Sequence, residues 1–351
     1  MSSNSFRRGI LAASLSLILL TVTFAMPPGD AQKALQVYFV DVEGGQATLF
    51  VTPAGQSLLI DTGWPGFEGR DADRIVAAAK NAGVKKIDFV LLTHYHRDHA
   101  GGVPQLAGKI PIGAFLDHGE NREPADASTE QTWQEYLKVA SQQKIQRTTA
   151  KPGDSLPLQG IETKVISSDG AVIERSLSGA GATNAACKTA EQPVDPTENP
   201  RSLGTLLTFG KLRILDLGDL TSEKEMLLMC PVNKLGAIDI YIVSHHGSLT
   251  SNSPLFLNGI APRVAIMDNG AAKGGAPLSW DAVRKSPRLE DLWQLHFSNE
   301  GGAAHNAADT FIANLSGPDA GNYLKLFAWP DGNFEVFNSR TQATKRYAPA
   351  H

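Results

Sequence analysis

The first hundred residues of the chain contain several short apolar runs bounded by turn residues. One further stretch has its apolar residues at the spacing of a helix. Apolar runs rich in Val, Leu, Ile and Phe predict strands, and apolar residues three or four positions apart predict a helix. On this basis we expect strands over residues 35–42, 47–51, 56–60 and 87–92, and a helix over residues 71–82. Three strands, a helix and a buried strand in this order indicate an α/β protein with layered sheets.

A later passage repeats the strand–turn–strand pattern of the first. Residues 204–219 resemble residues 47–63, and both hairpins end in an acidic loop that contains glycine. This similarity indicates a weak internal duplication into two β-rich halves, each followed by helices. The remaining expected elements are a helix over residues 222–228, a strand over 237–243, a loop, a strand over 263–267, a helix near 279–285, and strands over 323–328 and 334–338.

Two segments between the halves carry no strong pattern of their own. We interpret residues 119–150 as an insertion with one helix over residues 129–142, and residues 176–200 as a polar loop with proline-containing turns. Neither segment is long enough to be a second domain. We therefore expect a single domain over residues 32–351.

The charge balance limits the classes of partner. The chain of 351 residues has 32 Lys and Arg against 36 Asp and Glu, a formal net charge of −4. It lacks the basic excess that holds nucleic acid by its phosphates, so stable binding of duplex nucleic acid is not expected. A small-molecule or phosphoester substrate remains compatible, because a local metal site could take a single phosphate.

The N-terminus has the three parts of a secretory signal peptide. Arg7 and Arg8 precede an apolar stretch over residues 10–24, and small residues suit cleavage after Ala25 or Ala31. The stretch is short for a membrane span, so we expect a cleaved signal peptide, with an uncleaved anchor as the alternative. The mature protein would then be periplasmic or secreted and have no membrane span.

Two cysteines, Cys187 and Cys230, lie in the expected mature part. An oxidising compartment permits a disulfide between them, but they could equally be unpaired. They form no Cys-x-x-Cys motif, so we expect them to be structural.

The strongest chemical signal follows the strand expected over residues 87–92. The segment reads Thr-His94-Tyr-His96-Arg-Asp98-His99. Side chains of residues i and i+2 at a strand end point to the same side, so His94 and His96 can coordinate one ion. Asp98 and His99 can coordinate a second ion beside it. A lone buried histidine is usually a core residue, but this density of donors indicates a metal site.

This motif resembles the signature of the metallo-β-lactamase superfamily of binuclear metallohydrolases. The loops resemble its ComEC-type branch, found in competence proteins and phosphorylcholine esterases. The matching segments are Asp41–Ala47, Leu59–Gly63, Gly218-Asp219 and His245–Ser248. The resemblance implies an αββα sandwich of two similar halves and a cofactor of two divalent metal ions, Zn²⁺ with Mn²⁺ as an alternative.

The resemblance also implies the remaining ligands. Asp219 would bridge both ions, and one of His245 and His246 would be the last ligand of the second ion. We favour His246 as the ligand and His245 as a catalytic, substrate-facing residue, and the reverse assignment stays open. The chain has no histidine between His118 and His245, so the usual third histidine on the first ion is missing.

In the ComEC-type branch a small polar residue often takes that place, and residues 199–202 occupy it here. The first ion would then be held by His94, His96 and Asp219, with water completing its shell. Such a site is weaker and more open.

Other residues are expected around the ions. Asp98 would orient a metal-bridging hydroxide as well as bind metal. Asp61 would accept a hydrogen bond from a ligand imidazole, or else only end a strand. His118 and His305 are candidates for contact with substrate or ligands, whereas His296 alternates with apolar neighbours and is expected to be structural.

Three functions are compatible with this pattern. The first is an exported binuclear hydrolase that cleaves a phosphate ester or phosphodiester. The second uses the same site on a carboxylic ester, lactone or β-lactam ring, although the missing histidine disfavours a β-lactamase proper. The third is a non-catalytic metal-binding module. A role in DNA uptake does not transfer, because competence channel components carry many membrane spans.

Overall fold

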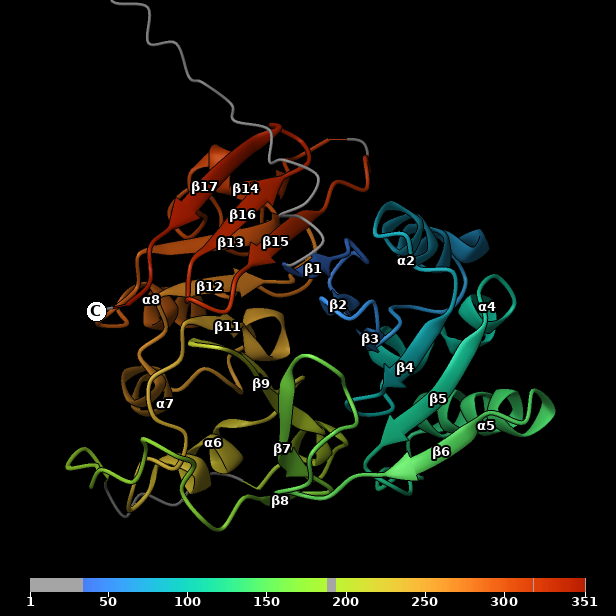
Figure 1. Cartoon of the computed structure of the whole chain (residues 1–351), viewed down its shortest axis with the longest axis horizontal. Coiled ribbons are helices and arrows are strands. Elements are labelled where there is room, and N and C mark those ends of the chain that lie inside the picture. The colour runs from blue at the N-terminus through green and yellow to red at the C-terminus, as the bar shows by residue number, and fades with distance from the viewer. Residues whose placement is uncertain (1–33, 188–193, 318, 351) are drawn as a thin grey trace, which may run out of the picture.

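Two mixed β-sheets pack face to face in the computed structural model, and helices cover their outer faces (Figure 1). The structure describes residues 34–187, 194–317 and 319–350. The expected signal peptide lies outside the described residues. Within them, no helix combines the length and the apolar character that crossing a membrane requires.

The first sheet has nine strands in the order β17-β16-β15-β1-β2-β3-β4-β5-β6. Antiparallel pairing runs from β17 to β3, and β3, β4, β5 and β6 are parallel. The strands are β1 (Leu35–Phe39), β2 (Thr48–Val51), β3 (Ser57–Ile60), β4 (Ile87–Leu91), β5 (Ile112–Asp117), β6 (Gln146–Thr149), β15 (Leu324–Ala328), β16 (Phe334–Asn338) and β17 (Ala343–Tyr347).

The second sheet has eight strands in the order β14-β13-β12-β11-β10-β9-β7-β8. It repeats the arrangement of the first, because an antiparallel hairpin, β9–β10, is followed by parallel strands. The strands are β7 (Glu162–Ser168), β8 (Ala171–Val172), β9 (Gly204–Phe209), β10 (Leu212–Asp216), β11 (Ile240–Ile242), β12 (Val264–Met267), β13 (Asp291–His296) and β14 (Ile312–Asn314).

Three apolar cores account for the layers. One lies between the sheets and includes Phe50 and Ile214; the second lies between the first sheet and α2, α4 and α5; the third lies between the second sheet and α6, α7 and α8. The helices are α2 (Arg70–Asn81), α3 (Arg97–Ala100), α4 (Val103–Ala107), α5 (Ala127–Gln142), α6 (Ser222–Met229), α7 (Pro254–Ile260) and α8 (Pro277–Arg284), with 3-10 turns η1 (Phe67–Gly69), η2 (Asn199–Arg201), η3 (Ser244–Gly247) and η4 (Asp309–Phe311). The expected αββα sandwich is confirmed.

Several elements differ from the expectation. The segment between β11 and β12 is not only a loop, since it contains α7, in which Pro254 is the first residue and the Ser253 hydroxyl accepts a hydrogen bond from the amide of Phe256. This serine–proline cap stabilises a helix start. Residues 119–150 supply α5 and β6, and β6 extends the first sheet as an edge strand beside β5. Of the two alternatives left open for Cys187 and Cys230, the structure has the disulfide.

Candidate metal centre

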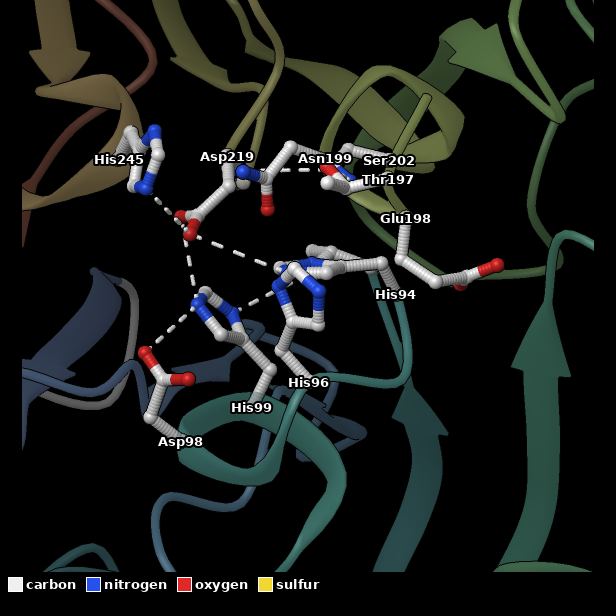
Figure 2. Close-up of polar contacts among 12 residues, drawn as sticks. His94, His96, Asp98, His99, Thr197, Glu198, Asn199, Ser202, Asp219 and His245 are labelled. Atoms are coloured by element: carbon white, nitrogen blue, oxygen red, sulfur yellow. Dashed lines mark hydrogen bonds and ion pairs between the residues drawn. The ribbon is translucent and has the colours of Figure 1, made fainter. Parts of the chain in front are cut away.

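The histidine and aspartate residues of the motifs meet where strands of both sheets end (Figure 2). His94 and His96 follow β4, and α3 carries Asp98 and His99. Strands β10 and β11 of the opposite sheet are followed by the Asp219 turn and by η3. The carboxyl ends of parallel strands are the usual place for a site in such sheets.

Local backbone geometry explains the turn before Asp219. Gly218 has a φ of 54°, and a Cβ atom there would lie 2.7 Å from the Cβ of Thr93. A side chain at this position would therefore collide with the loop that carries His94. Glycine lets the second hairpin approach the histidine motif of the first sheet closely.

The donor atoms form two groups that share one carboxylate. Oδ1 of Asp219 lies 3.2 Å from Nε2 of His99 and 3.5 Å from Nε2 of His246, while Oδ2 lies 3.8 Å from Nε2 of His94. The bridging position expected for Asp219 has this geometry. We call His94, His96 and Asp219 the first site, and Asp98, His99, Asp219 and His246 the second site.

The imidazoles of the first site fit a cation between them. Nε2 of His94 and Nδ1 of His96 are 3.0 Å apart. The outer nitrogens have partners, because Nδ1 of His94 lies 3.0 Å from the Thr93 hydroxyl and Nε2 of His96 lies 3.0 Å from Glu123. When the outer nitrogens carry the protons, the lone pairs of the two inner nitrogens, Nε2 of His94 and Nδ1 of His96, face and repel each other. A divalent ion bound between these nitrogens removes the repulsion.

The second site repeats this arrangement. The Nε2 atoms of His99 and His246 are 3.1 Å apart. Nδ1 of His99 lies 2.7 Å from Asp61 and Nδ1 of His246 lies 3.4 Å from Asp268. Hydrogen bonds with outer oxygens thus orient His99 and both imidazoles of the first site, as in known metal centres. Asp268 faces the outer nitrogen of His246 without forming a hydrogen bond to it. The donor set fits two divalent ions.

The charges at the second site follow from burial and close pairing. Burial lowers the pKa of His99, but Asp219, Asp98 and Asp61 outweigh this and raise it well above its usual range. Burial raises the pKa of Asp98, but His99 and Lys273 outweigh this and hold it well below its usual range. Asp98 is therefore an anion at neutral pH, ready to act as a ligand.

The two adjacent histidines of η3 point to different places, and both have left-handed backbone angles, φ 53° at His245 and φ 52° at His246. The imidazole of His246 belongs to the second site. The imidazole of His245 lies with Nε2 3.4 Å from Oδ2 of Asp219 and Nδ1 2.9 Å from the Thr250 hydroxyl. Such backbone angles cost on the order of 1–3 kcal/mol each and are concentrated at functional sites.

The other residues singled out in the sequence divide into three cases. Asp61 makes the contact expected of it with His99. His118 is buried and bonds to Glu198 at 2.9 Å rather than to a member of either site. His305 contacts the Gly301 carbonyl and lies 3.9 Å from Asp281, so the geometry adds no support for a substrate contact.

His296 belongs to a separate buried network. Its Nε2 lies 2.6 Å from Asp41, whose other carboxylate oxygen accepts a hydrogen bond from Arg74 at 2.9 Å. These three residues and Glu43 tie the loop after β1 to β13 and α2. The guanidinium already neutralises the Asp41 carboxylate, which agrees with the structural role expected for His296.

Sequence patterns did not indicate several residues around the sites. The ammonium group of Lys273 forms an ion pair with Oδ2 of Asp98 and lies 5.1 Å from the centre of the Trp64 ring. A cavity of about 220 Å³, lined among others by His245, Lys273 and Glu300, opens beside them. Lys273, Glu123 and Asp268 belong to no motif, and only the folded chain brings them to the histidines.

Comparisons with known proteins find one matching family model and several distant relatives. Residues 40–179 match the model of the Metallo-beta-lactamase superfamily. The chain is 27% identical to Recombination protein 2 of Haemophilus influenzae over 75% of this chain and 28% of that protein. It is 26% identical to Competence protein ComA of Neisseria gonorrhoeae, over 66% of this chain and 26% of that protein.

A shorter match, 36% identical, covers 21% of this chain and 26% of a hydroxyacylglutathione hydrolase of Xanthomonas euvesicatoria. The chain therefore spans about a quarter of the length of the relatives that it matches. The matches confirm the expected resemblance to the superfamily and to its ComEC-type branch.

Proposed function

Because residues 40–179 match the model of the metallo-β-lactamase superfamily, we propose that the chain is a metal-dependent hydrolase that cleaves a phosphate monoester or phosphodiester. The observation that carries this proposal is the position of Lys273. Its ammonium group contacts the Asp98 carboxylate at the edge of the second site, and its side chain is 36% exposed. A cation placed at the opening of a metal centre favours an anionic substrate.

Some residues of the two sites bind the metal ions, and others contact the substrate. When bound, two divalent ions lower the pKa of a coordinated water and neutralise the charge on the oxygens of a displacement. The contacts of Asp98 with described residues use Oδ2, which leaves Oδ1 to accept a hydrogen bond from the attacking water and orient it. Lys273 pairs with a non-bridging oxygen of the phosphate.

His245 is the residue best placed to serve the leaving group. Burial lowers its pKa although Asp219 opposes the shift, so the imidazole is neutral near pH 7. The Thr250 hydroxyl can donate to Nδ1, which leaves the proton on Nε2, the nitrogen on the side of the metal sites. From there it can donate a hydrogen bond to the leaving oxygen.

A carboxylic ester, lactone or β-lactam ring is the second candidate substrate class. The short match to a hydroxyacylglutathione hydrolase favours it, since that relative is named for an acyl substrate. A neutral ester gives Lys273 no charged group to bind, and for that reason we place it second.

We also propose that the protein works outside the cytoplasm on a small substrate. The N-terminal pattern of Arg7, Arg8 and the apolar residues 10–24 supports export. The disulfide between Cys187 and Cys230 supports it independently, because such bonds persist in oxidising compartments.

Turnover of an aryl phosphodiester by the full chain, loaded with Zn²⁺ or Mn²⁺, tests the proposal. We expect activity that Asp98→Ala reduces by at least about 100-fold, whereas Asp73→Ala, which removes an exposed carboxylate of α2, leaves it unchanged. Turnover of esters or lactones alone would move the assignment to the second class. No turnover of any of these substrates with either metal would contradict a catalytic role.

A further inference from the structure

The two metal sites differ in the number of donors that they offer. The second site has four, whereas the first site has only His94, His96 and Asp219. The resemblance to the superfamily places residues 199–202 where a third histidine usually lies, and the structure folds Asn199–Arg201 into the short turn η2. An inference about this turn rests on the binuclear centre of the proposed function and concerns how its first ion is held.

The side chain of Asn199 is buried beside the first site. The residue is 8% exposed, and its Oδ1 is buried without a hydrogen-bond donor from residues 34–187, 194–317 or 319–350. Figure 2 shows the carboxamide between Asp219 and the imidazoles of His94 and His96. A buried amide oxygen without a partner is costly, so this atom calls for a partner that the described residues do not supply, and a bound cation is such a partner.

The turn is held firmly against both ligand loops. The Glu198 carboxylate is buried and accepts hydrogen bonds from His118 at 2.9 Å, from the amide of Tyr95 at 3.3 Å and from the amide of Arg122 at 2.5 Å. The amide of Glu198 donates to Glu123 at 3.0 Å, and the same Glu123 oxygen lies 3.0 Å from His96.

The other end of the turn is fixed in the same way. The Ser202 hydroxyl accepts a hydrogen bond from the amide of Asp219 at 3.2 Å, and the amide of Leu203 donates to the Thr93 carbonyl at 2.7 Å. Asn199 is therefore positioned by bonds to the loops that carry the other donors of the first site. Such fixed placement is what a metal ligand needs.

We propose that Oδ1 of Asn199 is a ligand of the first ion, in place of the third histidine. An amide oxygen is a harder and weaker donor than an imidazole nitrogen, and oxygen ligands suit Mn²⁺ where imidazole suits Zn²⁺. The first site is then the weaker of the two and discriminates less between Zn²⁺ and Mn²⁺ than a three-histidine site would.

Calorimetric titration of the metal-free full chain with Zn²⁺ and separately with Mn²⁺, with elemental analysis of the ions retained, tests this. For the wild type we expect two binding steps. Asn199→Ala should weaken the looser step by at least about 10-fold and leave the tighter step within about twofold. Asn199→His should tighten Zn²⁺ at the looser step by at least about 10-fold and Mn²⁺ by less. Asn81→Ala, at an exposed asparagine of α2, should match the wild type.

The outcomes separate this proposal from the proposed function. Both steps unchanged in Asn199→Ala would overturn the assignment of Asn199, whatever substrate the protein cleaves. A single step in the wild type would overturn the binuclear centre and this proposal with it. If circular dichroism shows that Asn199→Ala is unfolded, Asn199→Asp is titrated in its place. Its side chain still offers an oxygen donor, so we expect both metal-binding steps to remain. Loss of one metal-binding step in Asn199→Asp would contradict the proposal.

Discussion

The carboxylate of Asp61 accepts a hydrogen bond from Nδ1 of His99 at 2.7 Å, and both side chains are fully buried. The same carboxylate accepts hydrogen bonds from the amide of Thr93 at 2.8 Å and from its hydroxyl at 2.6 Å. One buried group at the end of β3 thus orients His99 of the second site and fixes the hydroxyl that faces His94 of the first.

Asp61→Ala should weaken metal binding at the second site by about 10- to 100-fold, because His99 loses the partner that fixes its ring and tautomer. Competition with a chromophoric chelator measures this. Asp88→Ala is the matched control, since Asp88 follows the start of β4 and hydrogen-bonds Ser57 at a distance from the histidine motif. Unchanged affinity in Asp61→Ala would show that the contact is only structural.

Lys273→Ala should weaken inhibition by inorganic phosphate and raise KM for a phosphodiester by about 10-fold, because a charged partner of the anion is lost. Lys273→Arg should retain most of the binding, and Lys80→Ala, at an exposed lysine of α2, should behave like the wild type. Phosphate inhibition constants at low and high salt give the readout, with a smaller effect of Lys273→Ala at high salt. Equal constants for the wild type and Lys273→Ala would remove the support for an anionic substrate.

The histidine motif was predictable from the sequence because its geometry is local. His94 and His96 are two residues apart at the end of a strand, and Asp98 and His99 follow in the next turn. Asp219 lies over a hundred residues away, and only the resemblance to a family indicated it. Lys273 was not predictable, because it comes from a loop without periodicity and reaches Asp98 only when the two sheets pack together.

The fold shows the same division between local and tertiary signals. Buried strands such as β4 were recognised from runs made up mostly of apolar residues. The edge strand β6 was missed because its side chains are largely exposed and it is held by pairing with β5 rather than by burial. The start of α7 had a local signal in Ser253 and Pro254, but the helix is too short for its periodicity to show.

Burial of Asp216 makes stability depend on pH. Burial raises its pKa from 3.8 to about 7, with only partial compensation by the hydrogen bonds from Gln46 and the amide of Gly218. A carboxyl whose pKa is higher in the folded protein stabilises the fold below its unfolded pKa, and this contribution is lost as pH rises from about 4 to about 7.

Asp216→Asn removes that titration, and the Gln46 amide can turn to keep a hydrogen bond with it. The unfolding free energy of Asp216→Asn minus that of the wild type should therefore increase from pH 4 to pH 7 by about 2–4 kcal/mol and then level off. Urea unfolding of the metal-free proteins at several pH values measures the difference. Asp73→Asn should run parallel to the wild type, and a flat difference for Asp216→Asn would contradict the account.

The buried pair of Glu198 and His118 should matter for stability more than for chemistry. Glu198→Ala leaves the His118 imidazole and the amides of Tyr95 and Arg122 without their acceptor, so we expect a loss of about 3–5 kcal/mol in unfolding free energy. Urea unfolding of metal-free protein provides the measurement, with Glu120→Ala at a neighbouring exposed position as the control. A loss below about 1 kcal/mol would mean that η2 is not anchored by this carboxylate.

The most direct test of the account is the number of metal ions retained per chain by the wild type and by Asp219→Ala, measured by elemental analysis after dialysis against trace Zn²⁺ or Mn²⁺. Because Asp219 offers one oxygen to each site, we expect two ions in the wild type and at most one in Asp219→Ala, with thermal unfolding showing that Asp219→Ala is folded. One ion in both proteins, or two in both, would contradict a binuclear centre bridged by this carboxylate.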